Sequence, residues 1–263
     1  MLCYGKSDIG KKRSNNQDSF VLERICENTA VFVVCDGMGG AKGGKEASEL
    51  AIETFLREIR KSIEGLIKDG QCDTSTLDIA QIISDAMYAT NTAVYNKSKE
   101  SAEFSGMGTT LVAALEFDDY LYIVNVGDSR MYICSGGELH QVTHDHSYVQ
   151  YLVDIGQITL DEAKNNPNRN IIMRAIGIED EVEADLFKID MHVYKEFYVL
   201  LCSDGLSNYA ACDNIRSIIC DEIVGKNELS TKVDAMIELA NRNGGGDNIT
   251  AVLLKYGEAT NFD

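Results

Sequence analysis

Four aspartates in this sequence stand at the end of an apolar run and next to a glycine. Asp36 follows the run VFVVC, Asp128 follows IVNVG, Asp204 follows VLLCS, and Asp247 precedes NITAVLL. A single junction of this kind is usually only a turn, because aspartate and glycine are common turn residues. If the four strand ends lie side by side, their carboxylates repel one another and need cations, and oxygen ligands favour Mg²⁺ or Mn²⁺ over zinc.

Arg13 stands in the stretch RSNNQDSF, five residues before Asp18. A lone arginine is by default a surface charge, but its planar guanidinium is also the best side chain for binding phosphate oxygens. Two close divalent cations with an arginine beside them form a site that hydrolyses phosphoesters, because a metal-activated water can attack phosphorus in line. The residue spacing therefore indicates phosphoester hydrolysis but does not identify the substrate.

His144 and His146 have the H-x-H spacing that zinc sites also use. No third nitrogen or sulfur ligand accompanies them, and structural zinc takes four ligands. We expect both histidines to have a role in a loop or in packing the insertion that follows them.

The net charge limits the partners of the chain. Its 263 residues include 42 acidic and 24 basic side chains, a net charge of −18. This excess disfavours contact with a phosphate backbone, so we expect no nucleic-acid partner.

The cysteine pattern and the lack of long apolar runs bear on where in the cell the protein is found. Eight cysteines occur without a CxxC pair, several of them inside apolar runs, as is typical of a reducing compartment. No run of 18 apolar residues occurs, and the first residues, MLCYGKSDIGKKR, lack the apolar segment of an export signal. We expect a cytoplasmic protein that does not insert into membranes.

Apolar periodicity predicts the elements that must position the aspartates. Apolar runs of β-type residues predict strands at residues 30–35, 109–117, 120–126, 130–134, 197–202 and 248–255. Helical spacing predicts helices at residues 45–68, 77–97, 213–224 and 229–242. Most neighbouring strands are joined by short connections, which favours antiparallel sheets.

Residues 144–170 interrupt the strand pattern with two short helical pieces. Thr159 and Glu162 have the spacing of a capping box at the start of the second piece. Neither an internal repeat nor a low-complexity linker divides the chain. We therefore expect residues 1–263 to form one domain with an insertion at about residues 145–170, a length that is usually functional or mobile beside a site.

Eight motifs follow one another along the chain: KKRSNNQDSF, VFVVCDGMGG, GMGTTLVAAL, VNVGDSRMYI, VTHDHSYVQYLVDIGQIT, PNRNIIMRAIG, LLCSDGLSN and GGGDNITAVLL. In this order, from about Ser7 to Leu254, they resemble the metal-dependent protein phosphatases of the protein phosphatase 2C family, in its bacterial branch. Each motif alone is weak, and eight in series are strong. The resemblance implies an α+β fold, a four-layer α-β-β-α sandwich of two antiparallel sheets flanked by helix pairs.

The resemblance also implies a role for each candidate metal ligand. Asp36 is similar to the carboxylate that bridges two Mg²⁺ or Mn²⁺ ions, with the carbonyl of Gly37 on the second ion. Asp204 and Asp247 are similar to ligands of the first ion. Asp128 together with Asp204 matches the pair that holds a third, weaker metal in bacterial members.

Three further features carry over from the family. Asp18 is similar to its aspartate that contacts metal-bound water, and Arg13 is similar to its phosphate-binding arginine. The insertion is similar to the family's flap, which lies beside the site and affects substrate choice.

The sequence departs from the family pattern at two positions. Met38 stands where eukaryotic members carry a histidine that is a candidate general acid, and methionine has no proton to give. Gln17 stands where many members have a glutamate near the second metal, so we expect weaker binding of that ion.

We expect a monomeric phosphatase that hydrolyses phosphoserine and phosphothreonine in targets of a bacterial serine/threonine kinase. Two rivals stay open: a regulatory module of the same fold with weak or lost turnover, and a phosphatase for small phosphoesters or phosphotyrosine.

Overall fold

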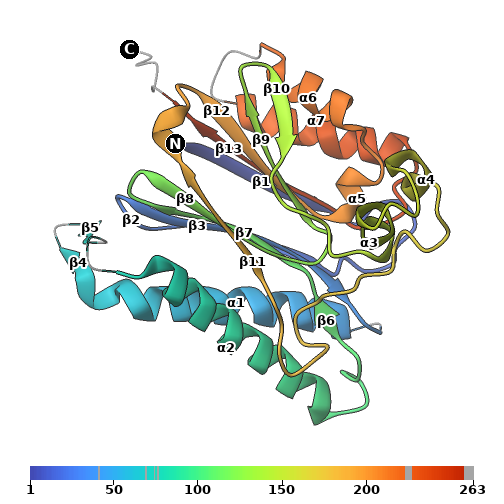
Figure 1. Cartoon of the computed structure of the whole chain (residues 1–263), viewed down its shortest axis with the longest axis horizontal. Helices are drawn as coiled ribbons and strands as arrows, with labels where there is room; N and C mark the ends of the chain where they lie inside the picture. The colour runs from blue at the N-terminus through green and yellow to red at the C-terminus, as the bar shows by residue number, and fades with distance from the viewer. Residues whose placement is uncertain (41, 69, 74, 76, 223–226, 258–263) are drawn as a thin grey trace.

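The computed structural model describes the chain except residues 41, 69, 74, 76, 223–226 and 258–263. Two large antiparallel sheets face each other, and long helices cover both outer faces (Figure 1). This is a four-layer α-β-β-α sandwich, and the predicted α+β fold class is confirmed.

The first sheet has five strands in the order β1-β13-β12-β9-β10. They are β1 (Leu2–Asp8), β13 (Ile249–Tyr256), β12 (Phe197–Cys202), β9 (Arg130–Ser135) and β10 (Glu138–Gln141). Its outer face packs against α6 (Cys212–Cys220) and α7 (Glu228–Arg242).

The second sheet has the strand order β11-β8-β7-β3-β2. These strands are β11 (Asp185–Asp190), β8 (Tyr120–Val126), β7 (Leu111–Phe117), β3 (Thr29–Met38) and β2 (Asp18–Cys26), and β6 (Gly108–Thr109) pairs with the end of β3. Its outer face packs against α1 (Gly43–Ile63) and α2 (Ile79–Glu100).

Short elements connect these layers. They are η1 (Glu64–Leu66), β4 (Ile67–Lys68), β5 (Gln71–Cys72), α3 (Tyr148–Asp154), α4 (Leu160–Lys164), η2 (Met191–Val193) and α5 (Asp204–Ser207). Helices α3 and α4 are the two pieces predicted in the insertion, and the capping box of Thr159 and Glu162 is formed in both directions. Among the described residues, no helix combines the length and the apolar character needed to cross a membrane.

Strand β3 shows why its sequence is apolar without alternation. Val31, Val33 and Cys35 pack against the helices, whereas Phe32 and Val34 pack between the two sheets. A central strand that is buried on both faces needs apolar residues at every position. The run therefore carries Asp36 to the end of a strand that the rest of the core holds in place.

All six predicted strands are present, but the helix predicted at residues 45–68 is too long. It ends at Ile63, and residues 67–68 instead pair with β5 through a turn at Gly70, which has a φ of 84°. Ile67 still packs on the same core, so the apolar spacing continues past the end of the helix. The helix predicted at residues 213–224 ends at Cys220, and residues 223 and 224 lie outside the described part of the chain.

In the two large sheets, the strands that were not predicted are β1, β2, β10 and β11, which are the four edges of these sheets. Edge strands have one unpaired side and expose much of their surface, so they do not need long apolar runs.

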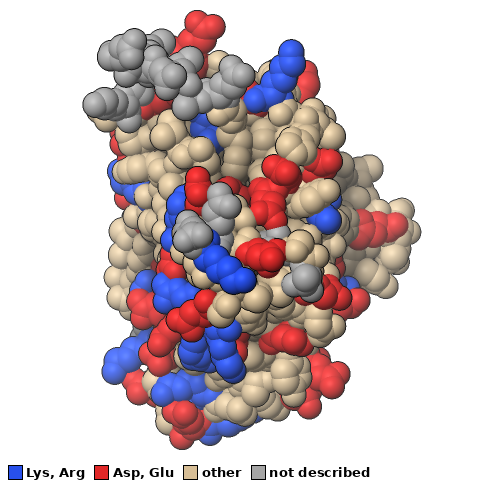
Figure 2. Space-filling model, turned by 90° about the vertical axis from the view of Figure 1, so that its left-hand side faces the viewer, with Lys and Arg blue, Asp and Glu red and all other residues tan. Residues whose placement is uncertain are grey.

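Figure 2 views one flank of the molecule, where basic and acidic side chains lie side by side rather than in one broad basic patch.

Candidate metal centre

The five candidate aspartates come from segments that end at one side of the sandwich. Asp18 and Asp36 are paired in the ladder between β2 and β3. Asp128 lies between β8 and β9, Asp204 begins α5 directly after β12, and Asp247 comes two residues before β13. These strand ends meet near the labels β6, α5 and α3 in Figure 1.

The carboxyl groups lie close enough to change one another's ionisation. Burial raises the pKa of Asp36 well above its usual value, and the charges of the other four aspartates raise it further. Burial raises the pKa of Asp204 in the same way, followed by the charges of Asp128 and Asp247. Such a cluster is unfavourable until protons or cations neutralise it.

Three of these carboxylates also have an oxygen that is buried and without a hydrogen-bond partner: Oδ1 of Asp18, of Asp128 and of Asp204. An unpartnered buried oxygen costs about 1–3 kcal/mol, and more when it is charged. No three His, Cys, Asp or Glu side chains of the described residues are grouped so that they could already hold an ion. The fit to hard cations such as Mg²⁺ or Mn²⁺ therefore rests on the free oxygens and on the repulsion between the carboxylates.

Asp18 is fixed by two hydroxyl groups from the opposite sheet. Ser203 and Thr250 donate to its Oδ2 at 2.7 and 2.6 Å. Burial raises the pKa of Asp18 to about 6, although the two hydroxyls oppose this shift. Because both bonds go to Oδ2, the other oxygen is left free for a ligand.

The backbone at Asp36 is held by two threonines that follow Gly108. The amide of Asp36 donates to Oγ1 of Thr110, and Oγ1 of Thr109 donates to the carbonyl of Asp36, both at 2.9 Å. A Cβ at Gly37 would lie 2.0 Å from the carbonyl oxygen of Gly44. Only glycine at residue 37 lets β3 approach the start of α1 this closely.

Arg13 reaches this site from the loop between β1 and β2. Its Nη2 lies 2.7 Å from Oδ2 of Asp247, and about half of its side chain is exposed. The hydrogen bond to Asp247 raises the pKa of the guanidinium, and the charges of Asp36 and Asp204 add to that effect. The structure thus brings Arg13 to the carboxylates, where it forms an ion pair with one of them.

Asn248 anchors the loop that carries Arg13. Its Nδ2 donates to the carbonyls of Ile9 and Asn15 at 3.0 Å, and its Oδ1 accepts from the amide of Gln17 at 2.8 Å. We did not single out this residue from the sequence. Its position directly after Asp247 is the one signal that could have indicated it.

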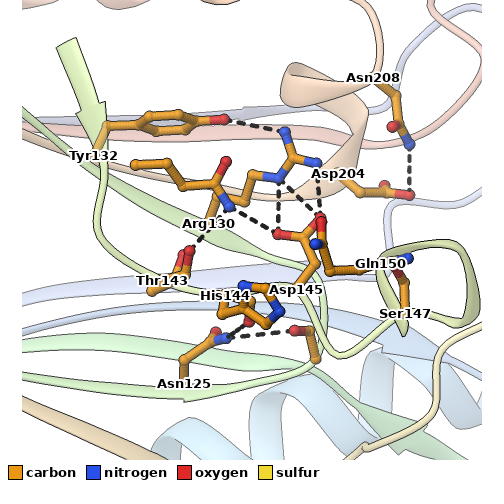
Figure 3. Close-up of polar contacts among 12 residues, drawn as sticks. Asn125, Arg130, Tyr132, Thr143, His144, Asp145, Ser147, Gln150, Asp204 and Asn208 are labelled. Carbon is orange, nitrogen blue, oxygen red and sulfur yellow. Dashed lines mark hydrogen bonds and ion pairs between the residues drawn. The ribbon is translucent and has the colours of Figure 1, made fainter. Parts of the chain in front are cut away.

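An ion pair between the partly buried Arg130 and the buried Asp145 was also not predicted. Nε and Nη2 of Arg130 lie 2.9 and 2.7 Å from the two carboxylate oxygens of Asp145, and Nη1 lies 3.2 Å from the hydroxyl of Tyr132 (Figure 3). Burial and the charge of Asp145 raise the pKa of Asp128 to about 6, whereas Arg130 opposes the shift. The sequence GDSR places this arginine two residues after Asp128.

His146 is buried and packs between neighbouring segments, as predicted, whereas the side chain of His144 is exposed. Nδ1 of His146 accepts from the amide of Gly127 at 3.1 Å, and its Nε2 lies 3.2 Å from Asp185. Nε2 of His144 lies 2.8 Å from Asp154 of α3.

Gln17 and Met38 lie at the edge of the site. Nε2 of Gln17 donates to the carbonyl of Gly40 at 3.0 Å. A glutamate at this position could not donate that bond. Met38 is the last residue of β3 and is half-buried.

The four layers and the acidic site at one end define a sandwich protein with a cluster of carboxylates suited to hard cations. Residues 4–253 match a family model described as Protein phosphatase 2C. "Serine/threonine phosphatase stp" of Listeria monocytogenes is 35% identical over 254 residues, which cover 95% of this chain and 94% of the relative. "Protein phosphatase PhpP" of Streptococcus pneumoniae is 33% identical and covers 96% of both chains.

Solved structures agree with the sequence comparisons. Serine/threonine phosphatase Stp1 from Staphylococcus aureus superimposes with a TM-score of 0.85 at 34% identity, over 97% of this chain and 95% of that one. The catalytic domain of the serine threonine protein phosphatase PstP, solved with two manganese ions, gives a TM-score of 0.78 at 34% identity, over 96% of both chains. This chain belongs to the protein phosphatase 2C family, in its bacterial branch.

Proposed function

We propose that this protein is a metal-dependent serine/threonine protein phosphatase, which hydrolyses phosphoserine and phosphothreonine with two Mg²⁺ or Mn²⁺ ions. The observation that carries the proposal is the meeting of five aspartates, three of which keep a buried oxygen without a partner. The family match supports the same activity, since the similar relatives are named serine/threonine phosphatases. One related structure is described as holding two manganese ions.

The ligand assignment follows the family pattern. Asp36 would bridge the two ions, with the carbonyl of Gly37 on the second, and Asp204 and Asp247 would bind the first. Asp128 with Asp204 would hold a third, weaker ion. When bound, such ions lower the pKa of a water molecule toward neutrality and neutralise charge on phosphoryl oxygens.

Asp18 would orient the nucleophilic water through its free oxygen. Its Oδ2 is already bound by Ser203 and Thr250, so Oδ1 is held in one direction. A fixed acceptor of this kind positions a water for attack without the cost of ordering it during the reaction.

Arg13 would bind the phosphate of the substrate. Its ion pair with Asp247 is partly exposed and therefore weak. If a cation neutralised Asp247, the guanidinium of Arg13 would be free, and its N–H groups could bind two phosphoryl oxygens and stabilise the charge that builds on them. Met38 has no proton to give, so the leaving alkoxide takes its proton from another group.

The proposed setting follows from the same resemblance. The partners are phosphoproteins that a bacterial serine/threonine kinase modifies, and the enzyme acts as a single domain, as a monomer and in the cytoplasm. All eight cysteines are free thiols, which suits a reducing compartment.

One assay separates this proposal from its rivals. Release of phosphate from phosphothreonine peptides and from p-nitrophenyl phosphate is measured in Mn²⁺, in Mg²⁺ and in EDTA. We expect turnover of both substrates with either metal and none in EDTA. Absence of turnover on both would indicate a regulatory module, and turnover on the small ester alone would indicate a phosphatase for small molecules.

A further inference from the structure

Two cysteines far apart in the sequence lie next to each other on the side of the sandwich that carries α6. Sγ of Cys134, in β9, is 3.7 Å from Sγ of Cys220, the last residue of α6. Figure 1 shows the hairpin of β9 and β10 running beside α6. We propose that Cys134 and Cys220 are a peroxide-sensitive modification site that forms a reversible disulfide between β9 and α6.

Solvent reaches this pair through a pocket. A pocket of about 440 Å³ is lined by both cysteines and by Gly136 and Gly137 of the hairpin turn. Cys220 is exposed and Cys134 is buried. A small oxidant can therefore reach the sulfur of Cys220 more easily than the buried sulfur of Cys134.

Lys232 of α7 contacts the end of α6 that carries Cys220. Nζ of Lys232, a fully buried residue of α7, donates to the carbonyls of Ile218, Ile219 and Asp221 at 3.2, 2.8 and 2.5 Å. These bonds satisfy carbonyls at the end of α6 that have no partner within the helix. The thiolate is the reactive form of a cysteine toward peroxide.

The two thiols differ in their roles. Burial and then the neighbouring thiol raise the pKa of Cys134 to about 12, so this residue stays protonated. The thiolate of Cys220 attacks hydrogen peroxide, which gives Cys220 sulfenic acid and hydroxide. The hydroxide takes the proton of Cys134 and becomes water. The sulfur of Cys134 then attacks the sulfur of the sulfenic acid and displaces a second hydroxide, which combines with the proton that Cys220 released. In total, two thiols and one peroxide give one disulfide and two waters.

The geometry allows the bond to close. A disulfide needs the sulfurs to be about 1.7 Å closer than they are here. Cys220 ends its helix, and Asp221 has extended backbone angles with a ψ of 131°, so the side chain can move without breaking a helical hydrogen bond beyond it. No hydrogen bond joins another pair of cysteine sulfurs in the described part of the chain.

The disulfide would tie the layer of α6 and α7 to the first sheet, away from the carboxylates. The pocket includes Glu196 and Tyr198 at the start of β12, whereas Asp204 follows the end of that strand. A strand of this length spans about 20 Å. We therefore expect the bond to raise the temperature of unfolding and to leave the carboxylate site untouched.

Peptide mapping tests the proposal. The protein is treated with hydrogen peroxide, its remaining thiols are blocked, and peptides are mapped without reduction. We expect a peptide that joins Cys134 to Cys220, which dithiothreitol removes, together with a higher melting temperature of the oxidised protein. The exposed Cys212 provides the matched control, because Cys212→Ser should leave the cross-link intact, whereas Cys134→Ser and Cys220→Ser should each abolish it.

Two results would overturn the inference. One is oxidation of Cys220 to the sulfinic acid with Cys134 still free. The other is a cross-link between Cys134 or Cys220 and a different cysteine in the same map. Neither result depends on phosphatase activity, so the test is independent of the proposed function.

Discussion

Asp204 combines two properties that make it the most informative single residue of the site. Its Oδ2 accepts from Nδ2 of Asn208 at 3.0 Å, and its Oδ1 is buried without a partner. A carboxylate in this state destabilises the metal-free protein and becomes favourable only when a cation neutralises it. One substitution at Asp204 can therefore separate its effect on activity from its effect on the stability of the metal-free protein.

We predict that Asp204→Asn lowers kcat by about 100-fold or more, because the proposed first metal ion would lose a charged ligand. The same change should stabilise the protein in EDTA, because it removes a buried charge from the cluster. Steady-state kinetics in Mn²⁺ and urea unfolding in EDTA provide the two readouts. Near-normal turnover would remove Asp204 from the site, and a less stable protein in EDTA would contradict the electrostatic argument.

Arg13→Ala should act mainly on substrate binding. The guanidinium is proposed to contact the phosphate in the bound substrate, so its loss should raise KM for phosphothreonine peptides by about tenfold or more. Arg13→Lys keeps the positive charge but loses the planar guanidinium, so its KM should lie between those of the wild type and Arg13→Ala. Unchanged KM and kcat in Arg13→Ala would place this arginine outside the phosphate site.

At the scale of elements, the loop between β1 and β2 depends on Asn248. This residue is almost fully buried and satisfies two carbonyls and one amide of the loop. The side chain thereby connects the position of Arg13 to the start of β13. We regard Asn248 as a positioning residue, since it acts through the loop.

Asn248→Ala should raise KM and lower the melting temperature together, because it leaves three polar groups of the loop without a partner, each at a cost of about 1–3 kcal/mol. Asn243→Ala is the matched control, since Asn243 donates one exposed bond, to the carbonyl of Tyr209. If the two variants have the same KM, the side chain of Asn248 is not needed to position the loop between β1 and β2.

We expect the contact of His146 with Gly127, which follows β8, to depend on pH. Burial lowers the pKa of His146, and the charges of Arg174 and His144 act in the same direction, although Asp185 opposes them. The unfolded chain takes up the proton at a pH of about 6.5, whereas the folded chain resists it to a lower pH. The stability from this residue is therefore complete above pH 6.5 and is lost as the pH falls through the folded pKa.

Urea unfolding of wild type and His146→Gln at pH 7.5 and at pH 5.5 isolates this effect. Glutamine can still accept from the amide of Gly127 but does not titrate in this range. We expect the wild type to lose stability relative to the variant on acidification, by at most about 1.4 kcal/mol per pH unit. A constant difference between the two proteins would show that His146 does not sense pH.

The elements also show what a sequence can reveal. The six strands predicted from apolar runs are present, because strands such as β3 are buried on both faces and need apolar residues throughout. The four edge strands were missed, since an exposed strand such as β11, with the sequence DLFKID, carries little apolar signal. The end of α1 was predicted too late because Ile67 keeps the helical spacing in a strand.

At the scale of the whole molecule, the site exists because two sheets bring their strand ends together. The junctions of Asp36, Asp128, Asp204 and Asp247 could be found from the sequence, because each is a local feature. The clamp of Ser203 and Thr250 on Asp18 could not, because it joins residues more than 180 positions apart. The pair of Arg130 and Asp145 stayed hidden for a similar reason, since nothing local shows that their segments meet.

Asp36, Asp204 and Asp247 are proposed to share divalent cations. Anomalous X-ray diffraction from crystals soaked in Mn²⁺ tests it directly. We predict two manganese peaks that share Asp36, with Asp204 and Asp247 on one of them. A map in which the manganese peaks touch none of these three carboxylates would contradict the account.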